Sequence, residues 1–376
     1  MKSINLNSAV GRDEPFDTPA VRATQGERTP TRTVTISFVL SALRSKAYRS
    51  MNRRPTTGLW INTIVAIIAL LLANQTFAAT YAYITNQGSD NVSVINLSSG
   101  MVTATVPVGK APVGVAIAQN LQRVFISNVD SKSVSVIDMS SNTVIDEIIL
   151  DGTPVGLVIS RDEKTLFVAD WFSDKIMAFN TADTKQHRDI AIGKAPAGMV
   201  LSTDGNRLFV ANRDSDDVAV IDARSLQILH RIAVGRHPYG LAISPDGKHL
   251  YAVNVYGNSV SVIDTLSSTV TATIKVGQHP YCAVVSPDSH RVYVTNTQGD
   301  SVAVLNADTN RVVATVAVGA FPEGIAYNSA NNRIYVASWS DDAVSVIDAS
   351  TNQLIGSIPT GKQSRAFGQF IAESEH

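Results

Sequence analysis

The sequence predicts an all-β protein, a seven-bladed β-propeller of 42-residue, four-stranded repeats whose ring is closed by the C-terminal strand joining the N-terminal blade. Three observations predict this fold. A short apolar strand ending in a small polar residue recurs every 42 residues. Each interval holds runs of β-branched and aromatic residues, separated by turns rich in Gly, Pro, Asp, Asn and Ser. Finally, the last strand of the chain has no partner in its own copy.

The recurring strand defines seven copies. It ends at Asn86, Asn128, Asp170, Asn212, Asn254, Asn296 and Ser338. The next strand ends at Asn96, Asp138, Asn180, Asp222, Asp264, Asn306 and Asp348. A further strand begins at Gly114, Gly156, Gly198, Gly240, Cys282 and Gly324. Four strands in a repeat of about 40–45 residues are typical of a propeller blade, and seven copies occupy residues 81–374.

The two ends of the repeat region predict how the ring closes. The first copy begins directly at "YAYITN", without the strand that precedes it in the other copies. The chain ends with an isolated version of that missing strand, Phe367–Ala372. Pairing the two completes the first blade and hides its sheet edge. Cys282 is the only cysteine, so no internal disulfide holds the ring.

The residues ahead of the repeats have the layout of an export signal. Arg53 and Arg54 precede the apolar run Leu59–Ala73, and the small residues Ala78 and Ala79 follow it. The run is shorter than the roughly 20 apolar residues of a spanning helix. We predict cleavage after Ala78 or Ala79, with an uncleaved anchor as the alternative.

These features divide the chain into three parts. Residues 1–50 precede Met51 and are predicted to be an upstream or disordered extension. Residues 51–79 are the predicted signal peptide, and residues 80–376 the propeller. The protein is therefore expected in the periplasm, in secreted form or at the cell surface.

The distribution of charge bears on possible partners. Residues 1–58 carry 10 basic and 4 acidic groups, so the remaining chain has 31 − 10 = 21 basic and 32 − 4 = 28 acidic groups. A mildly acidic body without runs of Lys or Arg has no electrostatic reason to bind nucleic acid or an anionic membrane. We expect a monomer without a membrane span after signal cleavage.

Several motifs resemble those of a known family. The strands "VYVTN" and "SVSVID", the turns "VGxxPxG" and "SPDG", and the closing "AFGQFI" resemble the YVTN-repeat family of YncE-like seven-bladed propellers. The resemblance covers residues 81–374 and implies an exported or surface-associated protein. Related propellers include subunits of quinone-dependent amine dehydrogenases and enzymes that bind ligands at one mouth of the ring. Because the matching motifs are structural, the resemblance implies no catalytic residue.

One face of the ring carries the candidate site. In this layout the "VGxxPxG" turns share a face with the turns between the second and third strands, and the "SPDG" turns lie on the opposite face. The residues before the turn proline are Ala111, Thr153, Ala195, His237, His279 and Phe321. Those after it are Val113, Val155, Ala197, Tyr239, Tyr281 and Glu323. At these two positions, three copies therefore have small or aliphatic side chains, and the other three have aromatic or titratable ones.

This asymmetry predicts a binding site on that face. Its candidate ligand-binding residues are Trp171, Arg236, His237, Tyr239, His279, Tyr281, Glu323 and Trp339. Packing between blades is the competing explanation for the aromatic rings. A metal site on the two histidines would need Glu323 or Cys282 as a third ligand, so we expect neither a metal nor a cofactor. Cys282 would be reactive only if His279 lowered its thiol pKa, and a buried filler is more typical.

The function that these features favour is binding. We expect an exported propeller that acts as a ligand- or protein-binding scaffold through one mouth of the ring, with a small ligand or a protein as partner. The alternative is a propeller enzyme or dehydrogenase-associated subunit with metal or acid–base chemistry at that mouth. Enzymatic activity is left undecided, and the lack of a haem-attachment motif argues against it. A purely structural role at the cell surface is also compatible with the sequence.

Overall fold

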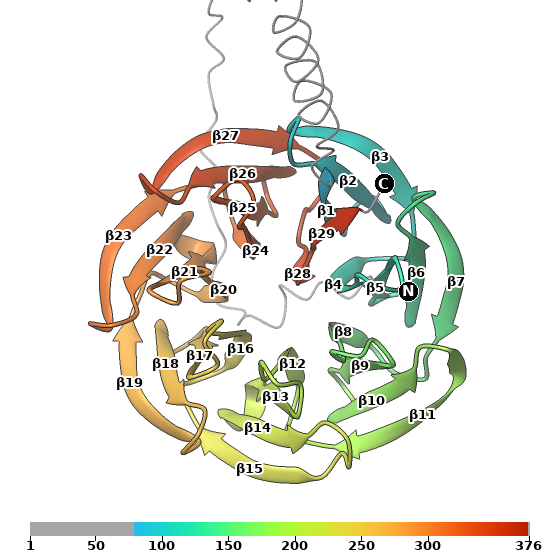
Figure 1. The fold of residues 1–376 in the computed structure, drawn as a ribbon, viewed down its shortest axis with the longest axis horizontal. Helices are drawn as coiled ribbons and strands as arrows, with labels where there is room; N and C mark the ends of the chain where they lie inside the picture. Colours follow the sequence, from blue (N-terminus) through green and yellow to red (C-terminus); the bar gives the residue numbers. More distant parts are fainter. Residues whose placement is uncertain (1–78, 375–376) are drawn as a thin grey trace, which may run out of the picture. The chain divides into compact units, whose positions relative to one another are not determined.

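A computed structural model describes residues 79–374, so the predicted signal peptide before Ala79 and the extension before it lie outside the described residues. The described chain forms seven sheets arranged radially around a central axis, six antiparallel sheets with four strands and one sheet with five (Figure 1). The predicted seven-bladed propeller is confirmed. Within residues 79–374, no helix is long and apolar enough to cross a membrane.

Each blade runs from an inner strand at the axis to an outer strand at the rim. The innermost strands are β4 (Pro112–Ala118), β8 (Pro154–Ile159), β12 (Pro196–Leu201), β16 (Pro238–Ile243), β20 (Pro280–Val285) and β24 (Pro322–Asn328). The second strands are β1 (Ala79–Asn86), β5 (Arg123–Asn128), β9 (Thr165–Asp170), β13 (Arg207–Asn212), β17 (His249–Asn254), β21 (Arg291–Asn296) and β25 (Arg333–Ser338). Blade 1 contains β1, and blades 2 to 7 follow in chain order.

The outer half of each blade is built in the same way. The third strands are β2 (Asn91–Asn96), β6 (Ser133–Asp138), β10 (Lys175–Asn180), β14 (Asp217–Asp222), β18 (Ser259–Asp264), β22 (Ser301–Asn306) and β26 (Ala343–Asp348). The outermost strands are β3 (Met101–Pro107), β7 (Thr143–Ile149), β11 (Asp183–Ala191), β15 (Ile228–Ala233), β19 (Thr269–Lys275), β23 (Arg311–Ala317) and β27 (Gln353–Pro359). Two short 3-10 turns, η3 (Arg213–Ser215) and η4 (Thr297–Gly299), follow β13 and β21.

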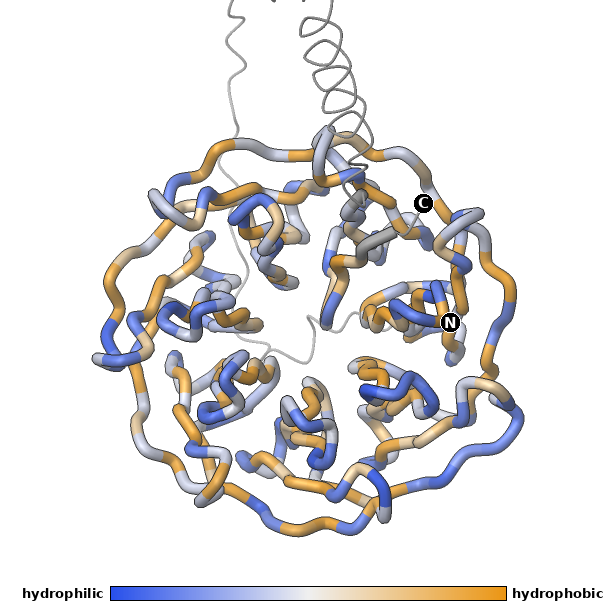
Figure 2. The backbone as a smooth tube through the Cα atoms, in the orientation of Figure 1, coloured by the Kyte–Doolittle hydropathy of each residue, from blue (hydrophilic) through white to orange (hydrophobic). Residues whose placement is uncertain are grey.

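The core lies between neighbouring blades. Strands β5 and β6 are buried at almost every residue, whereas β7 is exposed at all positions but one. A middle strand is covered on both faces by the adjacent blades, which is why its sequence is nearly continuous in β-branched and aromatic residues. Figure 2 shows hydrophobic residues in the inner strands of all seven blades.

The repeated "VG" turn is explained by close packing on the strand-end asparagine. A Cβ atom on Gly109 would lie 2.7 Å from the side chain of Asn128. The Asn128 amide in turn donates hydrogen bonds to the hydroxyls of Ser133 and Ser135, at 3.1 and 2.9 Å. The glycine and asparagine of the motif are therefore structural, because the asparagine side chain occupies the space that a Cβ atom on the glycine would need.

The C-terminal segment closes the ring as predicted, but in two pieces. Strand β29 (Ile371–Ser374) pairs antiparallel with β1 and completes blade 1. The preceding β28 (Phe367–Gly368) instead pairs in parallel with β4 and forms the fifth strand of blade 2. Gly368 has a φ of 116°, and a Cβ atom there would lie 2.4 Å from the carbonyl oxygen of Val115. Glycine thus allows the bend that divides the segment between two blades.

Candidate functional site

The turns that precede the innermost strands lie beside the turns that follow the second strands. The backbone N–H groups of Trp171 and Val255, for example, donate to the carbonyls of Thr153 and His237. We call the face formed by these turns the aromatic face, and the other end of the ring the opposite face.

The histidines of the aromatic face occupy a backbone position that alanine also occupies in sister blades. His237 and His279 have φ values of 54° and 48°, as Ala111 and Ala195 do at 54° and 50°. The turn is held by its main chain: the N–H of His237 donates to Asp216 at 2.7 Å, and that of His279 donates to Asn258 at 2.9 Å. A non-glycine residue in this left-handed conformation costs on the order of 1 kcal/mol. Because alanine serves equally well in sister blades, the imidazoles are not required by the turn.

The two imidazoles lie in one row with a tyrosine. The ring of Tyr256 is 4.4 Å from that of His237 and 5.4 Å from that of His279. The guanidinium of Arg213 lies 5.7 Å from the Tyr256 ring and 5.4 Å from the Trp171 ring. The His237 Nδ1 atom is buried and accepts or donates no hydrogen bond within the described chain.

Both imidazoles are neutral near pH 7. Burial lowers the pKa of His237, and the positive charge of Arg213 lowers it further. Burial also lowers the pKa of His279. A neutral imidazole offers one donor and one acceptor nitrogen, so the row presents hydrogen-bonding groups rather than positive charge.

Directly below this row, a layer of side chains fills the channel. It consists of the residues that follow the turn proline or its equivalent in the seven copies, each 9% exposed or less: Val113, Val155, Ala197, Tyr239, Tyr281, Glu323 and Arg365. We call this layer the plug. Its contacts join blades that are not neighbours in sequence, as between Trp171 and Tyr239, whose rings are 5.7 Å apart. The plug therefore extends across the channel.

The plug is held by one buried ion pair and its hydrogen bonds. The guanidinium of Arg365 donates to the carboxylate of Glu323 and, at 2.8 Å, to the hydroxyl of Tyr281. It also donates to the Gln87 side-chain oxygen at 3.1 Å, which accepts a second hydrogen bond from the Trp339 indole at 3.1 Å. Every polar atom of the guanidinium is thus directed at a partner inside the protein.

Burial determines the protonation of the other plug residues. It raises the pKa of Tyr239 to about 12 and that of Tyr281 well above its ordinary value. Burial also raises the pKa of Glu323, although the charge of Arg365 opposes that rise. Tyr239 stacks on Tyr281 with a ring separation of 4.2 Å. Because the tyrosines are neutral and stacked and the arginine is paired inside the protein, the plug has a structural role.

The remaining sequence candidates differ in where they lie. The thiol of Cys282 is buried, and burial raises its pKa, so it is not the reactive thiolate that a low pKa would create. Arg236 is exposed beside His237, and Trp339 is half-buried. No group of three or more His, Cys, Asp or Glu side chains among the described residues is arranged to hold a metal.

The structure thus divides the eight candidates into two sets. Tyr239, Tyr281 and Glu323 meet inside the plug, with Trp171 and Trp339 against its edges. Arg236, His237 and His279 reach the surface above it. Reasoning from the sequence missed four partners of these residues: Gln87, Arg213, Tyr256 and Arg365. The repeat holds a signal for three of them, because 42 residues separate Arg365 from Glu323 and Arg213 from Trp171, and 84 separate Gln87 from Trp171.

Solved structures share the architecture. The chain is similar to Kuenenia stuttgartiensis hydrazine synthase, with 21% identity, a TM-score of 0.62, and 67% of this chain and 87% of that chain covered. It is similar to a functionally unknown protein from Desulfotomaculum acetoxidans, with 15% identity, a TM-score of 0.68, and 78% and 99% covered. It is also similar to the dihydro-heme d1 dehydrogenase NirN in complex with DHE, with 14% identity, a TM-score of 0.62, and 89% and 85% covered. At these identities the likeness shows the fold alone.

Comparison of sequences is more specific. No curated protein matches the chain. The family model for YNCE-like β-propellers matches residues 73–206 and 199–355, which together span most of the chain and almost all of the ring. The predicted resemblance is therefore confirmed, and the chain belongs to the YNCE-like β-propeller family.

Proposed function

We propose that this protein is a binding module that docks a protein partner on the aromatic face. The observation that carries the proposal is the pair of histidines in left-handed turn positions that the main chain already holds. Because alanine occupies the same left-handed position in sister blades, the turn does not require an imidazole, and contact with a partner would account for the two histidines.

The shape of the aromatic face favours a protein over a small molecule. The plug fills the channel immediately below, so the face is shallow. Large aromatic side chains stand out from it: Phe172 is 59% exposed and Phe321 is 40% exposed. Aromatic and arginine side chains are the residues that contribute most energy at protein interfaces. In this proposal Arg236, His237, His279 and Trp339 contact the partner, with Trp171, Tyr239, Tyr281 and Glu323 supporting them from below.

We also propose that the docking takes place outside the cytoplasm. The basic pair, apolar run and small residues that precede the ring support this proposal. Strand β1 starts at Ala79, so cleavage after Ala78 leaves its pairing with β29 complete. Mass spectrometry of the exported protein should give an N-terminus at Ala79 or Thr80, and a mature chain that retains residues 1–50 would contradict this.

Site-specific photocrosslinking in the cells that make the protein tests the docking proposal. A benzophenone amino acid replaces Phe321 on the aromatic face or, as a matched control, Leu266, which is 90% exposed at a turn of the opposite face. We expect a discrete crosslinked product from position 321 that is lost when His237→Ala and His279→Ala are added. The same products from both positions, or a product indifferent to the double substitution, would refute docking on this face.

A further inference from the structure

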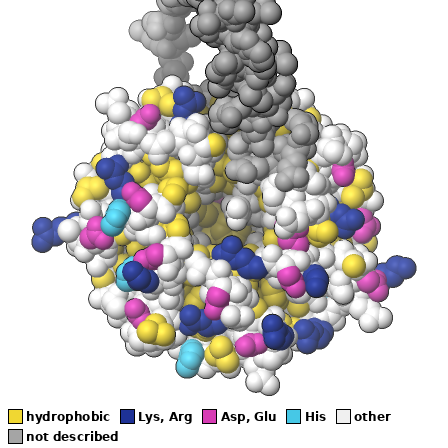
Figure 3. Space-filling model, viewed as in Figure 1, with side chains coloured by type: hydrophobic (Ala, Val, Ile, Leu, Met, Phe, Trp, Pro, Cys, Tyr) yellow, Lys and Arg dark blue, Asp and Glu magenta, His cyan; other side chains and the backbone are white. Residues whose placement is uncertain are grey.

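The half of the channel that lies beyond the plug encloses a cavity of about 570 Å³. Viewed down the ring, the described atoms surround a hollow whose wall is hydrophobic (Figure 3). The Phe367 ring lies at the base of this cavity, 4.9 Å from the ring of Tyr239 and 6.3 Å from that of Tyr281. The cavity therefore has a floor built on the plug, and its sides are the innermost strands.

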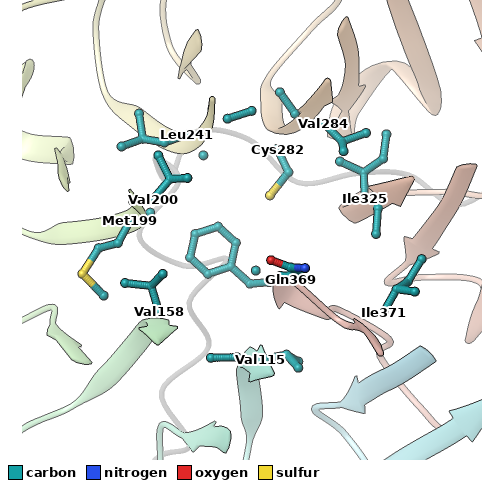
Figure 4. A pocket seen from close by; sticks show the side chains of 18 of the residues that line it. Val115, Val158, Met199, Val200, Leu241, Cys282, Val284, Ile325, Gln369 and Ile371 are labelled. Carbon is teal, nitrogen blue, oxygen red and sulfur yellow. The ribbon is translucent and has the colours of Figure 1, made fainter. Parts of the chain in front are cut away.

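The wall of the cavity is formed mainly by aliphatic side chains, and the polar residues Gln119, Asn328 and Ser329 line it at the ends of β4 and β24. One level of it is formed by the same repeat position in six copies: Val115, Leu157, Met199, Leu241, Ala283 and Ile325. The sulfur of Cys282 and the side chains of Val200 and Val284 lie around the same space (Figure 4). None of the lining residues carries a charge. Water beside these aliphatic side chains finds few hydrogen-bond partners, so an apolar molecule can displace it favourably.

A further polar side chain, Gln369, lies among these aliphatic residues. Five of its six sister copies place aliphatic residues at this position, and the sixth places Tyr327: Ile117, Ile159, Leu201, Ile243 and Val285 are the aliphatic ones. Its amide lies inside the ring of apolar side chains in Figure 4. The amide makes no hydrogen bond to the described part of the chain. A donor and an acceptor are therefore available beside the aliphatic part of the cavity wall, and a polar group in such surroundings can orient a small ligand.

We propose that this cavity binds a neutral, mainly apolar molecule of one or two rings that carries one hydrogen-bonding group facing the amide of Gln369. The volume is within the range of about 300–1,000 Å³ that small-molecule sites occupy. The ligand must be neutral because the wall offers no opposite charge, and an unpaired ion loses its hydration there. This site is separate from the aromatic face and does not depend on docking there.

Titration of the full-length protein with naphthalene and with 2-naphthol tests the proposal. We expect saturable binding of both, with 2-naphthol bound about threefold to tenfold more tightly because of one added hydrogen bond. Gln369→Leu should remove that preference and leave naphthalene binding unchanged. Ala283→Phe, which copies the phenylalanine of the seventh copy, should fill the cavity and abolish binding of both compounds.

A matched control and a second readout keep the test decisive. Ala182→Phe makes the same change at an exposed turn and should bind both compounds as the unmodified protein does. Saturating 2-naphthol should raise the melting temperature of the unmodified protein, because a ligand that binds only the folded state stabilises it. This readout needs no variant to fold. The proposal is overturned if neither compound binds saturably, if Ala283→Phe binds as well as Ala182→Phe, or if the melting temperature does not rise.

Discussion

The two halves of the central channel share one backbone and differ in how they are filled. Around the plug, Arg365 is bonded to Glu323 and Tyr281, and Tyr239 stacks on Tyr281. Two residues further along the same strands, aliphatic side chains leave a cavity of about 570 Å³. The backbone itself is held by close contacts between blades: a Cβ atom on Gly114 would lie 2.2 Å from the Val155 carbonyl oxygen. Side-chain size, and not the repeat, therefore decides whether the channel is closed or open.

The comparison separates residues that hold the ring from residues that are available to partners. A plug residue has most of its contacts inside the protein, so its loss should lower stability. A residue such as His279 or Gln369 has few such contacts, so its loss should alter binding and leave stability nearly unchanged.

The largest effect is expected from removing the closing segment. A chain ending at Gly361 loses β28, β29 and the plug arginine Arg365 together, which opens a sheet edge in blade 1. The cost should be several kcal/mol, out of the ~5–15 kcal/mol typical of a domain. Calorimetry should show a melting temperature at least about 10 °C lower, or no cooperative transition. Melting within a few degrees of the full chain would show that the ring does not depend on this closure.

Breaking the buried ion pair should have the next largest effect. Glu323→Val leaves the Arg365 guanidinium buried without its counter-charge, which should cost about 3–5 kcal/mol in urea unfolding. Adding Arg365→Val should recover much of that loss, because Val113 and Val155 fill the same position in sister blades. If the double variant is as unstable as the sum of the two single variants, the pair is not the element that holds the plug.

A smaller effect is expected from pH. The folded-state pKa of His237 and of His279 is lowered, so the unfolded chain takes up protons first as the pH falls through about 6.5. Stability should therefore decrease between about pH 7.5 and pH 5.5. His237→Ala with His279→Ala should show a smaller decrease in melting temperature over the same interval. Equal decreases in the two proteins would mean that these imidazoles titrate normally.

Much of the fold can be predicted from the sequence because each blade repeats the same local requirements. The glycine of the turn and the asparagine of the strand end recur since they pack on each other in every copy, as Gly109 and Asn128 do. The orphan strand Phe367–Ala372 predicts the closure for the same reason. The 42-residue repeat does not predict that this closing segment divides between two blades at Gly368. That division depends on the close approach of Val115 from blade 2.

The site is less predictable because its contacts cross the ring. Glu323 and Arg365 are one 42-residue repeat apart, so the repeat relates them. Arg365 and Tyr281, however, are 84 residues apart, and their hydrogen bond forms only when the ring is closed. The cavity beyond the plug follows from the summed volume of seven side chains around the axis. No single motif contains that volume, although the sequence does show Gln369 at a position where five of six sister copies are aliphatic.

The most direct measurement compares Tyr281→Val with His279→Ala. The two positions are two residues apart, and each substitution introduces the residue that sister blades have at that position. Tyr281 is buried in the plug, stacked on Tyr239 and bonded to Arg365, whereas His279 is half-buried above it. We predict that urea unfolding shows a loss of about 3 kcal/mol for Tyr281→Val and a change within about 1 kcal/mol for His279→Ala. A loss for His279→Ala as large as that for Tyr281→Val would show that the histidine row belongs to the scaffold.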